Sequence, residues 1–162
     1  MRYEGAARTL VHTLKYSRGM WLARDLGDVL EGCARASFDV GAIDTILPVP
    51  LNAARFRKRT YNQSALLAEE LSSRLGVPSP TRLLARTRHT PTQTHLTAEE
   101  RRRNVAGAFA VREPSLVRGR TLLVVDDVMT TGSTLSEIAA TLKAAGAWRV
   151  WALAIARADC AV

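Results

Sequence analysis

Cysteine and long hydrophobic runs are both scarce in this chain of 162 residues. The two cysteines, Cys33 and Cys160, lie far apart and form neither a C-x-x-C metal motif nor a disulfide framework, so a reduced cytoplasmic setting is expected. No apolar run is long enough to cross a bilayer, and the first residues lack the apolar segment of a signal peptide. We therefore expect a single domain over 1–162 with no membrane insertion.

Acidic residues are also in the minority. Lys and Arg number 23 against 15 Asp and Glu, which gives a net charge of +8. A basic balance favours contact with a polyanion, whether nucleic acid or a polyphosphate substrate. However, Arg greatly outnumbers Lys and Ala is abundant, as a GC-rich genome would also produce. At this level both interpretations of the charge stay open.

The most informative stretch is TLLVVDDVMTTGST at 121–134. It begins as an apolar, β-branched run typical of a buried parallel strand, and two carboxylates, Asp126 and Asp127, follow where the strand should end. A hydroxyl-rich turn comes next, and then helical apolar spacing up to a stop at Gly146. The turn consists of Thr130, Thr131, Gly132, Ser133 and Thr134.

This layout suits a phosphorylated sugar. Backbone N–H groups at a helix N-terminus point at an open site, where the helix dipole favours an anion. Gly132 lets the backbone approach a ligand closely, and the hydroxyl groups of the turn add donors. The adjacent carboxylates suit sugar hydroxyls or a divalent cation that arrives with the substrate. Together these features suggest a phosphorylated ribose.

Other interpretations of the same stretch have less support. The acid pair of P-loop nucleoside triphosphatases requires a G-x-x-x-x-G-K-[ST] loop, which this sequence lacks. In receiver domains the acid pair follows the first strand, whereas here only a short tail lies downstream. The plainest alternative is that Asp126 and Asp127 merely end a strand before an N-cap turn, which requires acids, hydroxyls and glycine to coincide by accident.

Helical and strand patterns alternate along the rest of the chain. Met20 and Trp21 are expected to join the apolar face of the second helix, and Asn62 is expected to cap the third. The alternation predicts an α/β fold whose central, mainly parallel sheet is flanked by helices, with a small N-terminal helical appendage over 1–40 and the core over 41–162. Helices are expected over 4–16, 22–30, 63–75 and 135–145, and strands at 45–50, 83–84, 108–111 and 148–156.

Two polar stretches are candidates for the site. Four cations crowd one loop beyond the strand at 45–50, where ligands of open α/β sheets bind and where a pyrophosphate would need positive charge. A solvated basic loop is the equal alternative. Residues 86–98 are Thr-rich and lack periodicity, which predicts a long exposed loop. Its His89 and His95 are candidate proton donors, although a solvated polar role is the commoner one.

Residues 124–134 resemble the motif of type I phosphoribosyltransferases that binds 5-phosphoribosyl 1-pyrophosphate (PRPP). The resemblance implies that fold, with Asp126 and Asp127 on the ribose 2- and 3-hydroxyls and the 130–134 turn on the 5-phosphate. It also implies that pyrophosphate is displaced from C1 of PRPP with Mg²⁺, for which Asp126 and Asp127 are candidate ligands. The motif says little about the second substrate.

Further stretches resemble the ComF family of competence-associated phosphoribosyltransferase-like proteins. They are LKY at 14–16, PVPL at 48–51 leading to RTYNQ at 59–63, and a set comprising Arg86, Thr87, Arg88, Thr90, Gln93, Leu96, Arg101, Asn104, Ala108 and Phe109. Ordinary salvage transferases do not share the last set. Two departures stand out. The family usually has glycine at Thr60, and it usually carries an N-terminal four-cysteine zinc module that would end where this chain begins, so no zinc site is expected here.

The ComF resemblance implies a PRPP-binding protein linked to DNA uptake, which either transfers phosphoribosyl to an unidentified acceptor or binds PRPP without turnover. The expected partners are PRPP, single-stranded DNA and a competence helicase, and a second copy of the chain is a further candidate. The alternatives are a nucleobase-salvage transferase and a PRPP-sensing regulator that binds nucleic acid. The implied pyrophosphate loop carries Arg55, Arg57 and Arg59, and the implied flexible lid carries Arg86, Arg88 and Gln93.

The acceptor is not identified by any aromatic residue. Only Trp148 and Trp151 could stack on a base, and both fall in the last expected strand, where packing in the core is the plainer expectation.

Overall fold

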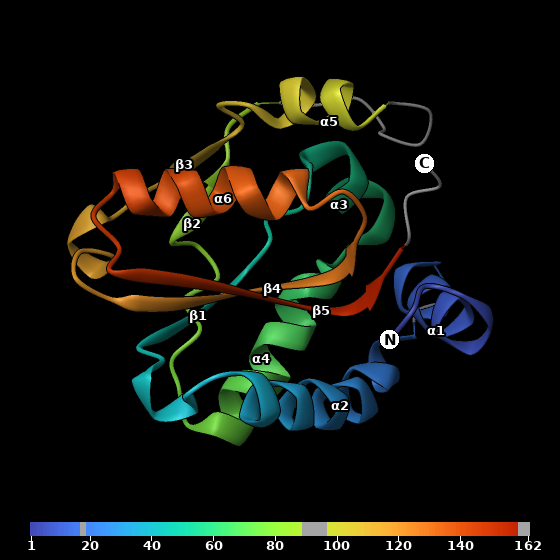
Figure 1. Cartoon of the computed structure of the whole chain (residues 1–162). Helices are drawn as coiled ribbons and strands as arrows, with labels where there is room; N and C mark the ends of the chain where they lie inside the picture. The colour runs from blue at the N-terminus through green and yellow to red at the C-terminus, as the bar shows by residue number, and fades with distance from the viewer. Residues whose placement is uncertain (17–18, 89–96, 159–162) are drawn as a thin grey trace.

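The computed structural model describes residues 1–16, 19–88 and 97–158 (Figure 1). Strands and helices alternate through most of these ranges, which confirms the predicted α/β class. The helices are α1 (Gly5–Tyr16), α2 (Leu22–Ser37), α3 (Ala53–Arg59), α4 (Gln63–Leu75), α5 (Ala98–Val105) and α6 (Ser133–Ala144). The strands are β1 (Thr45–Pro48), β2 (Leu84–Arg86), β3 (Phe109–Val111), β4 (Thr121–Met129) and β5 (Arg149–Arg157).

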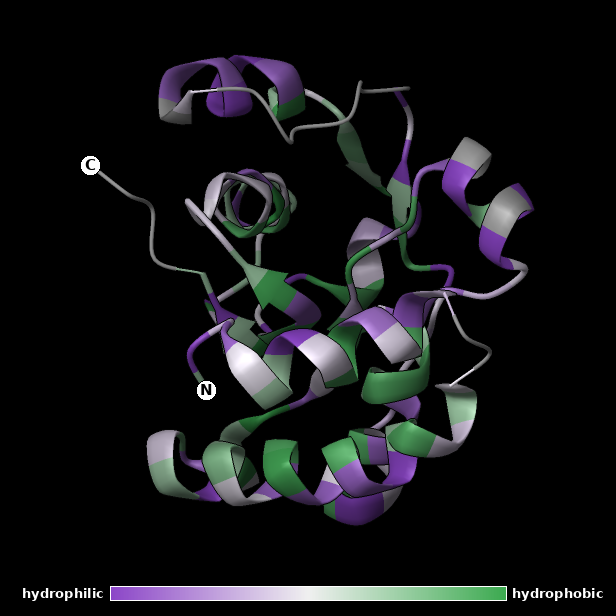
Figure 2. Cartoon of the chain, turned by 90° about the vertical axis from the view of Figure 1, so that its right-hand side faces the viewer, coloured by the Kyte–Doolittle hydropathy of each residue, from purple (hydrophilic) through white to green (hydrophobic). Residues whose placement is uncertain are grey.

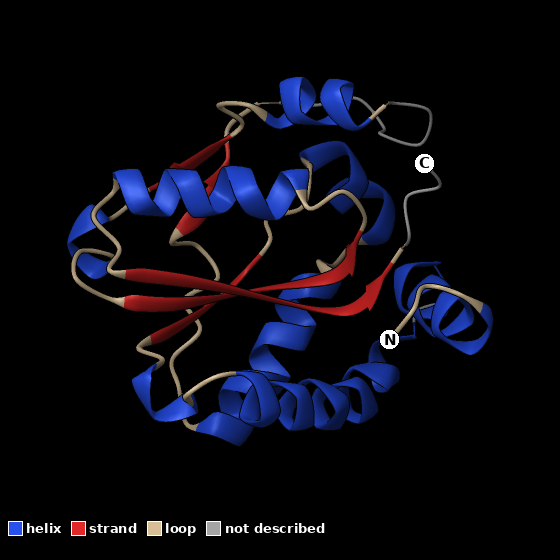
Figure 3. Ribbon diagram, viewed as in Figure 1, coloured by secondary structure: helices blue, strands red, loops and turns tan. Residues whose placement is uncertain are grey.

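Three strands form a parallel sheet in the order β1-β4-β5. Its register pairs Leu47 with Val124 on one side of β4 and Val125 with Leu153 on the other. The central position explains why β4 is buried without interruption from Thr121 to Val125. β2 and β3 pair antiparallel in a separate two-stranded sheet, which Figure 3 shows apart from the parallel sheet, on the side of α6.

Helices cover both faces of the parallel sheet (Figure 1). α6 covers one face, where Ile138 packs in a buried cluster with Val124, and α2 and α4 cover the other, where Val125 joins a second cluster. Alternate residues of β4 therefore point to opposite layers, as the period of a strand requires. In Figure 2 the helices carry both apolar and polar residues, as expected where one face is buried and the other is exposed.

The N-terminal helices are present as predicted, and they take part in the main core. Val11 of α1 and Leu30 of α2 belong to the same buried cluster as Leu67 of α4 and Leu123 of β4. α2 thus completes the layer below the sheet. No described helix is long and apolar enough to cross a membrane.

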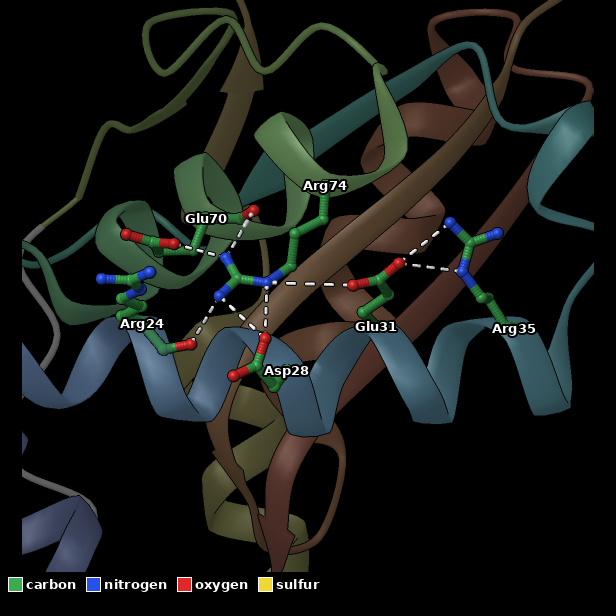
Figure 4. A network of polar contacts seen from close by, with 6 residues as sticks. All are labelled: Arg24, Asp28, Glu31, Arg35, Glu70 and Arg74. Carbon is green, nitrogen blue, oxygen red and sulfur yellow. Dashed lines mark hydrogen bonds and ion pairs between the residues drawn. The ribbon is translucent and has the colours of Figure 1, made fainter.

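Arg74 of α4 joins α4 to α2 through a network of polar contacts (Figure 4). Its guanidinium donates to Asp28 Oδ1 at 3.0 and 3.1 Å and to the carbonyl oxygen of Arg24 at 2.7 Å, and it is paired with Glu70 in its own helix. Gly27 makes room for this arrangement, because a Cβ at that position would lie 2.7 Å from Arg74 Nη1. The network fixes α2 against α4 from outside the apolar core.

The basic segment expected as a loop forms the short helix α3. Its first turn is closed by a hydrogen bond from the N–H of Phe56 to the carbonyl oxygen of Asn52 at 2.9 Å. Ala, Arg and Lys have high intrinsic helix propensity. The segment therefore forms a helix although its sequence lacks the apolar stripe by which amphipathic helices are usually predicted. The next helix, α4, begins as predicted, since the Asn62 side chain accepts from the N–H of Ser64.

Predictions for three bulky residues were wrong. Met20 and Trp21 are 49% and 68% exposed, because they lie in the short 3-10 turn Gly19–Trp21 and do not follow the phase of α2. Trp148 is 67% exposed, since it precedes β5 and does not enter the sheet. Trp151 is partly buried as expected and stacks on Phe38, with ring centroids 5.0 Å apart.

Candidate functional site

β4 ends at the edge of a cavity of about 420 Å³. The cavity lies at the carboxyl ends of β1 and β4, and its lining includes every residue from 126 to 135 together with side chains from α1, α3, α4, β2 and α5. In Figure 1 the chain that leaves β4 turns directly into α6, which covers one face of the sheet. Crevices at the carboxyl ends of parallel strands are the usual ligand sites of α/β folds.

The acid pair lines this cavity, and each carboxylate is held by specific groups. Asp126 is half-buried, and its Oδ1 accepts from Ser64 Oγ and from the Asp127 N–H, both at 2.9 Å. Asp127 is only 4% exposed, and its Oδ1 accepts from the Val128 N–H at 2.8 Å. Lys15 Nζ lies 2.7 Å from Asp127 Oδ2 as an ion pair, without the alignment of a hydrogen bond. Both carboxylates are thus fixed in orientation.

The environment of Asp126 changes its protonation. Burial first, and then the negative charge of Asp127, raise the pKa of this carboxyl to about 7, against the opposing effects of the hydrogen bonds from the Asp127 N–H and Ser64 and of the positive charge of Lys15. A cation or a hydroxyl donor that favours the ionised carboxylate would lower this pKa again. Acids perturbed by burial and by a like charge in a cleft are typical of functional sites.

The hydroxyl-rich turn lies directly against the cavity at the start of α6. Gly132 has φ +76°, and a Cβ added there would meet only Met129 Sδ at 3.9 Å, so the left-handed backbone rather than lack of space favours glycine. The hydroxyls of Thr131 and Ser133 lie 2.7 Å apart. All five residues from 130 to 134 line the cavity, where the first amides of α6 suit an anion.

Four arginines from the three elements α3, β2 and α5 line the same cavity: Arg55, Arg59, Arg86 and Arg101. Arg59 donates to Tyr16 Oη at 2.8 Å and to Gln63 Oε1 at 3.1 Å, and its guanidinium lies 4.6 Å from the centroid of the Tyr16 ring. Burial lowers the pKa of Arg86, whose guanidinium lies 5.4 Å from the centroid of the Phe109 ring. The cavity therefore combines an acid pair with a largely cationic wall.

Other predicted site residues are placed differently. Arg57 is exposed and is not among the residues that line the cavity. Arg88 donates to the carbonyl oxygens of Asn104 at 3.1 Å and Ala106 at 2.7 Å, so it holds the end of α5. Gln93, like His89 and His95, lies outside the described residues.

Several cavity residues were not identified from the sequence as site residues. Lys15 comes from α1, Ser64 from the first turn of α4, and Tyr3 from the N-terminal segment. The Tyr3 N–H donates to the carbonyl oxygen of Arg157, the last residue of β5. A signal for Lys15 existed. It follows Ala7 and Val11 at helical spacing, so a lysine occupies the buried stripe of α1.

Comparison with known proteins agrees with this geometry. The sequence matches the phosphoribosyl transferase domain family over residues 61–160. It is 35% identical over 153 residues to Competence protein F of Haemophilus influenzae, covering 92% of this chain and 67% of that protein. The chain belongs to the ComF group of the phosphoribosyl transferase domain family. It is also 41% identical over 151 residues to the DNA utilization protein YhgH of Escherichia coli K12, covering 89% of this chain.

The chain spans 65% of the length of the YhgH relatives that it matches. Solved structures support the fold of this ComF-type chain. The glutamine PRPP amidotransferase of B. subtilis matches with a TM-score of 0.55 and 20% identity, covering 82% of this chain and 26% of that one. A purine phosphoribosyltransferase from Pyrococcus horikoshii matches with a TM-score of 0.51 and 19% identity, covering 85% and 73%. The predicted type I phosphoribosyltransferase fold is confirmed.

Thr60 is a ComF-group position at which the backbone is informative. The resemblance predicted glycine there, and Thr60 has φ +67°, a left-handed conformation that β-branched residues rarely adopt. Its N–H donates to the carbonyl oxygen of Phe56 at 2.7 Å, which closes α3 just before α4 begins. The position therefore keeps a glycine-like backbone although this chain carries threonine.

Proposed function

We propose that this protein binds PRPP with Mg²⁺ in the cavity and transfers its phosphoribosyl group to an acceptor, with release of pyrophosphate. One observation carries the proposal: the acid pair of β4, the turn at the start of α6 and four arginines line the same space. A phosphate, a sugar with vicinal hydroxyls and a pyrophosphate each have a matching set of groups there.

In this proposal the parts of PRPP occupy successive regions of the cavity. The 5-phosphate lies on the 130–134 turn, where hydroxyls and helix amides donate to it. The ribose lies against Asp126 and Asp127, which accept from its hydroxyls. The pyrophosphate faces the cationic wall, with Arg55 and Arg59 from α3 as its main contacts. Arg86 extends this wall from β2.

The carboxylates at this site fit Mg²⁺ bound together with a substrate. The described residues contain no group of three or more His, Cys, Asp or Glu arranged to hold a metal ion. Mg²⁺ commonly uses one or two carboxylates with substrate phosphates as its other ligands, so Asp126 and Asp127 suffice. When bound, the ion would neutralise charge on the pyrophosphate oxygens.

The protein's own contribution to the reaction is placement and charge. Breaking the bond from C1 to pyrophosphate leaves positive charge on the ribose and adds negative charge to the leaving group. The carboxylates of Asp126 and Asp127 stabilise the first, and the arginines stabilise the second. Holding the 5-phosphate at the start of α6 fixes C1 relative to both.

A second candidate is a PRPP-binding module that acts on DNA without turnover. Exposed aromatic residues lie on two elements that line the cavity: Tyr16 of α1 is 53% exposed and Phe56 of α3 is 49% exposed. Aromatic rings interleaved with arginines are typical of surfaces that bind single-stranded nucleic acid. The names of the relatives, DNA utilization protein and Competence protein F, favour the same role. A helicase or a second copy of the chain would be a further partner.

One experiment separates the two candidates. The protein is incubated with PRPP, Mg²⁺ and a panel of nucleobases and amines, and pyrophosphate release is followed. Release that depends on one acceptor supports transfer. PRPP binding by calorimetry without release, together with salt-sensitive binding of single-stranded DNA, supports the second candidate. Absence of PRPP binding refutes both.

The matched variant for this experiment is Asp126→Asn with Asp127→Asn. We expect it to lose PRPP binding while remaining folded, and the exposed Asp39→Asn serves as the control. Full PRPP affinity in the double variant would remove ribose recognition from the acid pair.

A further inference from the structure

Lys15 is the cavity residue whose placement is least explained by packing. It lies on the same stripe of α1 as the buried residues Ala7 and Val11, yet it reaches the cavity and ends 2.7 Å from Asp127 Oδ2. The two side chains are only 18% and 6% exposed. A lysine so little exposed on a helix stripe requires a specific partner.

The carboxylate of Asp127 indicates what is missing from this arrangement. Its Oδ1 accepts from the Val128 N–H, but its Oδ2 is buried without a hydrogen bond, although the Lys15 ammonium lies beside it. A buried acceptor without an aligned donor costs free energy. A ligand hydroxyl that reached Oδ2 would supply that donor, and it would meet the Lys15 ammonium at the same point.

We propose that Lys15 is a ribose-binding residue that shares one sugar hydroxyl with Asp127. The hydroxyl donates its proton to Asp127 Oδ2 and accepts from Lys15 Nζ, since a hydroxyl has one donor and two acceptor positions. This inference rests on the proposed binding of a sugar phosphate in the cavity. Lys15 lies outside residues 61–160, which match the phosphoribosyl transferase domain family, so α1 adds a binding residue to the matched core.

The end of α1 is anchored on both sides of Lys15. The carbonyl oxygen of Leu14 accepts from Tyr61 Oη, and Tyr16 Oη accepts from Arg59 Nη2 at 2.8 Å. Both partners belong to the α3–α4 region, which also lines the cavity. The backbone that carries the ammonium is therefore fixed, and only the flexible Lys side chain has to shift to admit a hydroxyl.

A purely electrostatic role makes a different prediction. If Lys15 only balanced the charge of Asp127, its removal would lower the affinity for all sugar phosphates by the same factor. If it donates to a hydroxyl, its removal lowers the selectivity for that hydroxyl. Selectivity between ribose 5-phosphate and its deoxy analogues therefore distinguishes a binding role from a structural one.

The test measures the affinity of wild type and Lys15→Met for ribose 5-phosphate, 2-deoxyribose 5-phosphate and 3-deoxyribose 5-phosphate by calorimetry. We expect wild type to bind one deoxy analogue about tenfold more weakly than ribose 5-phosphate, as loss of a hydrogen bond to a charged group predicts. In Lys15→Met the ratio should fall to about threefold or less. The control Lys143→Met removes an exposed lysine whose Nζ donates to the carbonyl oxygen of Trp148, and it should keep the wild-type ratio.

A second variant covers the case in which Lys15→Met does not fold. Lys15→Arg keeps the positive charge beside Asp127 but changes the direction of the donors, and we expect the ratio to fall at least threefold. If the ratio of affinities for ribose 5-phosphate and its deoxy analogue is unchanged in a folded variant, the proposed role of Lys15 is wrong. The proposed function still stands in that case, provided that wild type binds PRPP. If wild type binds neither PRPP nor ribose 5-phosphate, the proposed function fails, and the role of Lys15 fails with it.

Discussion

Replacing Asp126 with asparagine should stabilise the protein above neutral pH. The pKa of Asp126 is raised from 3.8 to about 7 in the folded protein, so the folded state holds a proton that the unfolded state has already released. Stability contributed by this proton is complete below the unfolded pKa and is lost as the pH rises through 7. Above pH 7 the folded state carries an ionised, half-buried carboxylate next to Asp127.

The size of the effect follows from the difference between the two pKa values. About three pKa units correspond to about 4 kcal/mol at the limit, because one unit corresponds to about 1.4 kcal/mol. Asp126 is half-buried at an open cavity, so solvent screens the charge, and we expect about 1–2 kcal/mol. Asparagine keeps an acceptor for Ser64 Oγ and for the Asp127 N–H, so the local hydrogen bonds survive.

The assay is urea denaturation of wild type, Asp126→Asn and the control Asp39→Asn at pH 5.5 and pH 8. The advantage of Asp126→Asn over wild type should grow by about 1 kcal/mol between the two pH values, because wild type loses its bound proton over that range. The control should show no such growth. An advantage that is the same at both pH values would show that the carboxyl of Asp126 is not perturbed by its surroundings.

Two further substitutions near the site should change stability in opposite directions. Asp127→Asn should destabilise the protein by about 1–2 kcal/mol at pH 8, because it leaves the little-exposed Lys15 ammonium without its ion-pair partner. If urea denaturation shows this variant to be as stable as wild type, the ion pair contributes nothing to stability. Thr60→Gly should raise the midpoint of thermal unfolding by about 1–3 °C, because it relieves the left-handed strain at φ +67°, and a lower midpoint would show that the threonine conformation is not strained.

The central motif could be predicted from the sequence because its parts are contiguous. Strand, acids, turn and helix follow one another within 121–144, so local rules place them in order, and the structure confirms that order. Gly132 occupies the left-handed position that starts α6. The helix over 63–75 was equally local, since the cap at Asn62 and the stop at Gly76 lie at its two ends. In each case the signal needed no information about the rest of the fold.

The remaining site residues depend on tertiary contacts that local patterns do not contain. Lys15 meets Asp127 only because α1 packs against β5, the neighbour of β4, and Tyr3 reaches the cavity only because the N-terminal segment runs along β5. Arg57, which was predicted with the pyrophosphate loop, does not line the cavity. It shares a basic cluster with Arg55 and Arg59, but α3 winds as a helix, so residues two apart face different sides.

The two neighbouring acids are treated unequally by the fold, and the difference shows which carboxyl has its charge less compensated. Asp127 has a cation 2.7 Å away, supplied by α1, whereas Asp126 receives hydrogen bonds from the uncharged Ser64 hydroxyl and a backbone N–H. In the absence of a ligand, Asp126 is therefore the carboxyl whose charge is the less compensated. A Mg²⁺ ion or sugar hydroxyl would supply that compensation, so binding energy offsets a cost already present in the folded protein. Because Lys15 is supplied from outside residues 61–160, an N-terminal helix decides how the two acids of the matched core differ.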